Sequence, residues 1–301
     1  MFVAGPPGTD PGPPARLRAA VARVFDETSA TALDPALRPF LVDLVRQYGN
    51  ALREDLLTTG AGHSFGEMAE ALLPSITAPD EPVDLLVLVF AMHDLRLARS
   101  TAAYLSDLCP GTPVAFAVCD QGSAAAFTAL RLTQSYLGSG SRGRALVFVV
   151  EQSALHYELT EPAPVPDRHT AVALKFESAT GGPVAVRQHT GVDAKRVPGL
   201  FAEAARAAGG TVIASSRLAE AAPGVADVVA APGQPYTGVW WELAQLPRDG
   251  VVLVADYEPA LGYLCFSTVD YEKDAVDYQK DIVDSAADTV NHGADRSLVA
   301  G

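Results

Sequence analysis

The sequence predicts an α/β fold made of two successive α/β halves, and three observations support this. Apolar runs at residues 84–91, 113–119 and 144–151 alternate with two helical patterns. These runs are continuously apolar, which is typical of parallel strands covered on both faces. A shorter α/β series follows after residue 183. Hydrophobic residues make up 49% of the 301 residues and charged residues 19%, so the chain can bury one large core or two coupled ones.

The other elements follow from the hydrophobic periodicity. Helices are expected at residues 15–26, 35–57, 64–73, 98–108, 123–137, 197–208 and 236–245, and further strands at 169–177, 183–189, 211–215, 225–230, 250–255 and 261–269. The Gly-containing segment 178–182 predicts a hairpin between its two flanking strands. The predicted organisation is a disordered Gly/Pro-rich lead (1–14), a first half with N-terminal helices (15–182), a second half (183–270) and an acidic C-terminal tail (271–301).

Charge and cysteine content exclude several functional classes. The net charge is −14, which opposes binding to nucleic acid and to anionic membranes. No stretch is long enough to cross a bilayer, and the N-terminus lacks the order of a signal peptide. The three cysteines have no paired spacing, so neither disulfides nor a metal site is expected. We therefore expect a cytoplasmic protein without metal or bound cofactor.

One apparent nucleotide motif is better explained as a turn. Gly138, Gly140 and Gly143 match GxGxxG. A dinucleotide site needs these glycines after a strand and at the start of a helix, where the helix N-terminus faces the pyrophosphate. Here they close a predicted helix and precede a strand, which indicates a helix C-cap.

The junction between the second apolar run and its following helix is the strongest candidate site. Asp120, Gln121, Gly122 and Ser123 lie there, ahead of the Ala-rich helix SAAAFTAL. A helix N-terminus offers free N–H groups and a positive dipole end, which stabilise an oxyanion in acyl transfer. Ser123 is thus either a helix N-cap or a nucleophile. Cys119 is the rival nucleophile, although its strand position favours a buried structural thiol.

Two histidines follow neighbouring strands of the same block. His93 comes just after the first strand and His156 just after the third. Because the carboxyl ends of parallel strands form the ligand crevice of an open sheet, either histidine is a candidate base for Ser123, and Asp120 a candidate to orient it. The alternative is that each histidine is a surface or hydrogen-bonded loop residue.

Three stretches of the sequence resemble the thiolase fold, and within it the type III ketosynthases. VDLLVLVFAMHDLRLARSTAAYLSDL resembles the strand and helix before the nucleophile. VAFAVCDQGSAAAFTALRLTQSYL, followed by GRALVFVVEQSA, resembles the nucleophile strand and helix and the next strand. PRDGVVLVADYEPALGYLCFSTV resembles the closing strand-loop-strand. The resemblance covers about residues 75 to 270 and implies a thiolase-like fold of two related halves with mixed sheets, and helices layered between and outside them.

The resemblance also shows departures at the catalytic positions. Counting back from Ala129-Leu130, Ser123 takes the place of the family's active cysteine. Val212 to Ser216 stands where the family has its histidine, and the segment 234–241 contains no asparagine. Residues 255–259 (ADYEP) replace the glycine-rich closing loop that helps to form the oxyanion hole. The Cys-His-Asn set for decarboxylative condensation is therefore missing.

These departures imply two functions within the family. One is an acyltransferase of a natural-product pathway, which takes an acyl group from a CoA or a phosphopantetheinyl carrier thioester without C–C condensation. Ser123 would be its nucleophile. The other is a catalytically silent, chain-length-factor-like partner of an active ketosynthase, which Gln121 and the altered closing loop favour. Members of the family are typically homodimers through the sheet edge near the nucleophile strand, so the resemblance implies a homodimer, with an acyl carrier protein as a possible partner. A self-sufficient homodimer with turnover would count against the silent-partner function.

A third alternative is that the fold hosts different chemistry. Tyr236, Trp240, Trp241 and Asp256 would then shape the pocket. Nothing in the sequence identifies that chemistry, because a fold does not supply a function.

Overall fold

The computed structural model describes residues 15–271, except for residues 30, 48, 97–98, 140–142, 158–163 and 179–183. The first half contains β1 (Ala15–Val24), α1 (Leu37–Gln47), α2 (Glu54–Thr59), α3 (Phe65–Glu70), α4 (Leu73–Ile76), β2 (Leu85–Val89), α5 (Thr101–Leu108), β3 (Val114–Val118), α6 (Ala124–Gly138), β4 (Arg144–Glu151) and β5 (Thr170–Ser178). The second half contains β6 (Ala185–His189), α7 (Val197–Ala208), β7 (Thr211–Ala214), α8 (Ser216–Ala221), β8 (Val228–Val229), α9 (Gly238–Gln245), β9 (Val251–Glu258) and β10 (Tyr263–Asp270).

The two halves repeat one sheet topology. The first sheet has the order β1-β5-β4-β2-β3, and the second has the order β6-β10-β9-β7-β8. In both sheets the three strands at one edge are parallel and the other two are antiparallel to their neighbours. Each strand of the first half therefore corresponds to the strand of the second half whose number is five higher, so that β4 corresponds to β9. By the same equivalence, α6, which precedes β4, corresponds to α9, which precedes β9.

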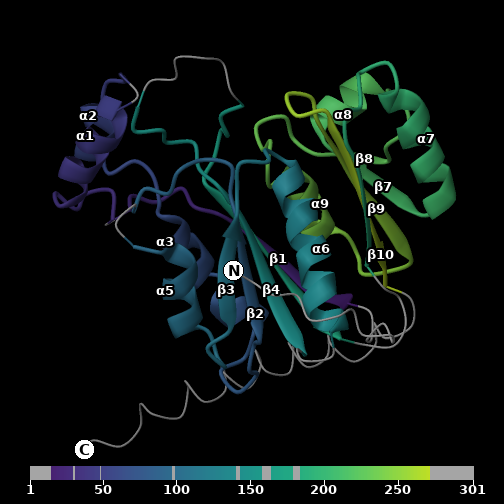
Figure 1. The fold of residues 1–301 in the computed structure, drawn as a ribbon, viewed down its shortest axis with the longest axis horizontal. Coiled ribbons are helices and arrows are strands. Elements are labelled where there is room, and N and C mark those ends of the chain that lie inside the picture. The colour runs from purple at the N-terminus through teal and green to yellow at the C-terminus, as the bar shows by residue number, and fades with distance from the viewer. Residues whose placement is uncertain are drawn as a thin grey trace, which may run out of the picture.

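The halves pack as five layers, with helices between and outside the sheets (Figure 1). The central layer is α6 and α9, and their side chains share one hydrophobic cluster with strands of both sheets. Helices α3, α4 and α5 cover the other face of the first sheet, and α7 and α8 cover the other face of the second. Strand β2 shows why its sequence is continuously apolar: Leu85, Val87 and Val89 belong to the central cluster, whereas Leu86 and Leu88 belong to the outer one.

The N-terminal segment corrects one prediction. Residues 15–26 were expected to form a helix, but Ala15–Val24 is strand β1. This strand pairs antiparallel with β5 along its length, with a register shift between Leu17 and Ala19. Its Ala, Leu and Arg residues favour a helix locally. Pairing with a strand about 150 residues away in sequence outweighs that preference, and half of the residues of β1 are buried.

Two further predictions are wrong in detail. The strands on either side of residues 178–182 do not form a hairpin, because β5 belongs to the first sheet and β6 pairs with β10 in the second. The expected helix at 35–57 is two helices, α1 and α2. Helix α8 was not predicted; Ser215 caps it by accepting a hydrogen bond from the Leu218 amide.

Some predictions fall outside the described residues. These are the disordered lead at 1–14 and the tail from residue 272 onward. Within the described part of the chain, none of the helices is long and apolar enough to span a bilayer.

Candidate functional site

A sharp turn between β3 and α6 presents the start of α6 to the second half. Asp120 and Gly122 both have left-handed backbone conformations, with φ of 61° and 51°. Such values are uncommon for residues other than glycine, so the turn at Asp120 is a strained one. Ser123 follows with φ −69° and ψ −17° and is only 3% exposed. The turn thus buries Ser123 at the first turn of a long helix.

The backbone and the side chain of Ser123 differ in their partners. The Ser123 amide donates a hydrogen bond to Oε2 of Glu258 at 3.1 Å. The Ser123 hydroxyl does not cap α6 and has no hydrogen-bond partner of normal geometry, although the atom is buried. It still lies close enough to Asp256 to favour the charged form of that carboxyl group and so lower its pKa. Glu258 therefore accepts the amide of the N-cap residue itself, whereas a capping serine side chain accepts an amide two or three residues further along the helix.

Asp256 and Glu258 lie on β9 and share Arg217 of α8. Arg217 places Nη2 at 3.7 Å from Asp256 Oδ1 and Nη1 at 3.5 Å from Glu258 Oε2. Its Nη2 also donates to the Pro235 carbonyl at 3.1 Å. Burial raises the pKa of Asp256 to about 6, against the lowering effects of Arg217, of hydrogen bonds from Ser215 and Tyr257, and of the nearby Ser123 hydroxyl. One guanidinium thus compensates two buried carboxylates at the end of β9.

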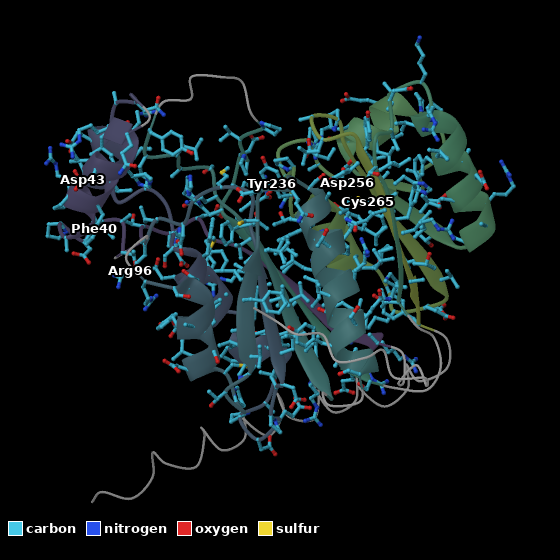
Figure 2. All side chains as sticks on the ribbon, viewed as in Figure 1. Phe40, Asp43, Arg96, Tyr236, Asp256 and Cys265 are labelled. Carbon is cyan, nitrogen blue, oxygen red and sulfur yellow. The ribbon has the colours of Figure 1, made fainter. Side chains whose placement is uncertain are left out.

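An equivalent contact lies at the start of α9. Glu151, the last residue of β4, accepts hydrogen bonds from the amides of Tyr236 and Thr237 at 3.0 and 3.2 Å. It also accepts one from the Thr237 hydroxyl. Glu151 is 1% exposed, and burial raises its pKa to about 7 in spite of these hydrogen bonds. Tyr236 and Asp256 both lie near the carboxyl ends of the strands (Figure 2).

The space around Ser123 is nearly filled. Its lining includes Phe90, Gly122, Ala126, Val149 and Tyr236. The gap that these side chains leave is too narrow to admit a water molecule. This gap, as the described residues line it, has no room for a substrate.

The two candidate histidines have partners elsewhere. His93 is exposed, and its carbonyl accepts a hydrogen bond from Gln152 Nε2 at 3.1 Å. His156 is 4% exposed, and its Nε2 lies 3.2 Å from the Ala61 carbonyl oxygen. Burial lowers the pKa of His156, and the bond to Ala61 opposes that effect. Neither histidine is among the hydrogen-bond partners of Ser123 in the described part of the chain.

The remaining residues of the turn contact one another. Asp120 is exposed, and it accepts a hydrogen bond from the Cys119 thiol at 3.3 Å. Burial, and then Asp120, raise the pKa of Cys119, which keeps that thiol protonated and weakly nucleophilic. Gln121 accepts a hydrogen bond from the Thr128 hydroxyl at 2.6 Å. None of these contacts connects Asp120 to a histidine.

Sequence reasoning did not assign Glu151, Arg217 or Glu258 to the site. A signal for the two glutamates was present, because RALVFVVE and VVLVADYE are both apolar runs that end on a glutamate. A charged residue at the end of a buried strand needs a partner, and a helix N-terminus across the sheet supplies one. Arg217 gave no comparable signal, since it lies on the unpredicted helix α8.

Solved structures of other proteins resemble the whole chain closely enough to assign its fold. AbyA1, a tetronic acid condensing enzyme, is 18% identical, with a TM-score of 0.59 over 85% of this chain and 99% of its own. ChlB3, described as an "aceyltransferase", is also 18% identical, with a TM-score of 0.58 over 86% of this chain and 98% of its own. The 3-oxoacyl-(acyl-carrier-protein) synthase III of Aquifex aeolicus VF5 is 14% identical, with a TM-score of 0.57 over 85% and 100%.

The chain has the thiolase fold. Within it, the similar structures are ketosynthase III-like, as the sequence resemblance predicted. No family model and no curated protein sequence matches the chain. In the thiolase fold of this chain, Ser123 lies at the start of the central helix of the first half, and the two glutamates join that layer to the opposite sheet.

Metal chemistry has no evident site in the described residues. No three or more His, Cys, Asp and Glu side chains among them are placed to hold a metal ion. The acidic groups at the ends of β4 and β9 instead have helix amides and Arg217 as partners.

Proposed function

We propose that this protein is a catalytically silent, ketosynthase-like subunit of a biosynthetic pathway that handles acyl thioesters. The observation that carries the proposal is the hydrogen bond from the Ser123 amide to Glu258. Acyl transfer needs free N–H donors where negative charge develops on the substrate oxygen. A carboxylate that already accepts the Ser123 amide removes that donor and repels a second negative charge at short range.

The packing around Ser123 supports the same proposal. The gap beside it is too narrow for water, and Tyr236 and Phe90 belong to its lining. Ligand sites are usually preformed concavities of several hundred Å³. The His156 ring contacts the Ala61 carbonyl, away from Ser123, and the His93 ring is not among the hydrogen-bond partners of Ser123 in the described residues, so the contacts do not support either histidine as the base.

The pairing surface that we propose is the open edge of the first sheet. Strand β3 pairs with β2 on one side, and it is the last strand in the sheet order. Val114 is 40% exposed, and Ala117 is also exposed. An apolar edge strand pairs readily with an edge strand of another subunit. The proposed partner is an active thiolase-fold enzyme, and self-pairing through the same edge is the homodimer that the resemblance implies.

Two measurements test this proposal together. The first is intact mass after incubation with a panel of acyl-CoAs and acylated carrier proteins, for which we expect no acyl adduct. The second is co-purification with a thiolase-fold enzyme encoded nearby, for which we expect a stable complex. Acylation of Ser123, shown by loss of the adduct in Ser123→Ala, would refute catalytic silence.

A second candidate function is acyl transfer, with Asp256 in place of the histidines. The buried Ser123 hydroxyl has no hydrogen-bond partner, and Asp256 beside it has a pKa of about 6. At neutral pH this carboxylate could accept the Ser123 proton as the hydroxyl oxygen attacks the thioester carbonyl, and the CoA or carrier thiolate leaves. An adduct lost in both Ser123→Ala and Asp256→Asn would favour this function.

A further inference from the structure

Each half of the molecule supplies a glutamate to a helix of the other half. Glu258, at the end of β9, accepts the amide of Ser123 at the start of α6. Glu151, at the end of β4, accepts the amides of Tyr236 and Thr237 at the start of α9. Because β4 corresponds to β9 and α6 to α9, the two contacts are equivalent in the repeated topology. We call them the Glu258 cap and the Glu151 cap.

The two caps differ in how firmly they hold their carboxylate. Glu151 has two helix amides and the Thr237 hydroxyl as donors. Glu258 has one helix amide at 3.1 Å, with Arg217 at 3.5 Å and the Ala260 amide at 3.4 Å. Distances of 3.4 and 3.5 Å are at the long limit for hydrogen bonds. Of the two carboxylates, that of Glu258 is therefore the more easily replaced by a carboxylate ligand.

The start of α6 offers what a carboxylate ligand needs. It has the Ser123 amide, the positive end of a 15-residue helix dipole, and the Arg217 guanidinium. The Ser123 hydroxyl is buried near Asp256 and makes no hydrogen bond of normal geometry with any of the described residues. A buried polar group without a partner is unusual and marks a place where a ligand atom can bind.

Gly122 shapes this position around a carboxylate. A Cβ at residue 122 would lie 2.3 Å from Glu258 Oε2 and 2.7 Å from its carboxyl carbon. The carboxylate thus packs directly against the glycine backbone, at a residue whose φ of +51° also favours glycine. A side chain at residue 122 would therefore collide with the carboxylate.

We propose that the start of α6 is a carboxylate-binding site whose present occupant is Glu258, and that a small free carboxylate binds there when the Glu258 side chain is removed. The ligand class is a monocarboxylate of the size of acetate, since Glu258→Ala deletes one methylene and one carboxylate. The proposal does not depend on whether the protein is a silent subunit or an acyltransferase.

The test is thermal unfolding of Glu258→Ala in increasing acetate, with chloride replacing acetate at constant ionic strength and pH. We expect a saturable rise in Tm, of about 2–4 °C at ten times the dissociation constant. Wild type and Glu258→Gln should not respond, because their side chains still fill the site. An equal response in all three proteins, or none in Glu258→Ala, would overturn the proposal.

Glu258→Asp provides a second test in case Glu258→Ala does not fold. The shorter side chain keeps the charge but withdraws it from the Ser123 amide by one methylene. We expect hydrogen exchange at the start of α6 to become about tenfold faster than in wild type, with or without acetate, because the aspartate carboxylate still repels a second carboxylate. Exchange at the wild-type rate in Glu258→Asp would show that the carboxylate is not the ligand of this helix end.

Discussion

Replacing Glu151 by Gln tests the electrostatics at the junction of the two halves. Oε2 of Glu151 accepts two backbone amides, and Oε1 accepts the Thr237 hydroxyl. A glutamine can place its carbonyl oxygen where Oε2 accepts the two amides, and its NH₂ group where Oε1 lies. The Thr237 hydroxyl can then rotate and accept a hydrogen bond from that NH₂ group. The substitution therefore keeps the contacts and removes the titrating group.

The expected effect follows from the pKa of Glu151. Burial raises it from 4.5 to about 7 in the folded protein, so the native state binds more protons than the unfolded state between these values. The stability that Glu151 contributes is then present at low pH and is lost as pH rises through 7. At 1.36 kcal/mol per pKa unit, the loss between pH 5 and pH 8 is about 2–3 kcal/mol.

Urea unfolding of wild type and Glu151→Gln at pH 5, 6, 7 and 8 measures this effect. We expect the stability of the variant relative to wild type to rise by about 2–3 kcal/mol across the series. The exposed Glu220→Gln on α8 changes the net charge equally and should show no such trend. A difference that is constant with pH, or that falls as pH rises, would refute the burial argument.

Three further substitutions test other parts of the argument. Gly122→Ala should destabilise the protein by about 2–4 kcal/mol in urea unfolding, because a φ of +51° strains an alanine and the new Cβ pushes the Glu258 carboxylate from the Ser123 amide. The matched Gly199→Ala has nothing within 4 Å and should be neutral or stabilising. Arg217→Met should cost about 2–4 kcal/mol in the same assay, and more at pH 8 than at pH 6, because it leaves Asp256 and Glu258 uncompensated. Val114→Lys should convert the proposed edge-paired dimer to a folded monomer in light scattering, and an unchanged dimer would exclude β3 as the interface.

The parallel core was predictable because its signal is local. Strands β2, β3 and β4 are continuously apolar, and each is followed or preceded by a helix of ordinary length, so short windows of sequence contain the pattern. Strand β1 was not predictable in this way. Its residues favour a helix, and only the pairing with β5, far along the chain, makes it a strand. The supposed hairpin at 178–182 failed for the same reason, since β6 finds its partner in β10.

The candidate site was predictable only in part. Ser123 was identified because a helix start has a recognisable sequence, and the structure places it at the first turn of α6. Its partners come from β9 and α8, more than 90 residues later, and no local pattern connects them. His93 and His156 were candidates because they follow neighbouring strands, but such a position does not fix where a side chain points. The His156 imidazole lies against the Ala61 carbonyl, and the hydrogen bond at His93 is made by its backbone carbonyl, with Gln152.

The difference between Ser123 and Thr237 bears on whether the protein is a silent subunit or an acyltransferase. Both are hydroxyl residues at the start of a central helix, and both have a glutamate from the opposite half on their amide. The Thr237 hydroxyl donates to its glutamate, whereas the Ser123 hydroxyl makes no hydrogen bond of normal geometry within the described part of the chain. A purely structural cap would be expected to satisfy both, because an unpaired buried hydroxyl costs about 1–3 kcal/mol. The unsatisfied hydroxyl lies where the thiolase resemblance places the nucleophile, so an acyl adduct at Ser123 is the outcome that separates a silent subunit from an acyltransferase.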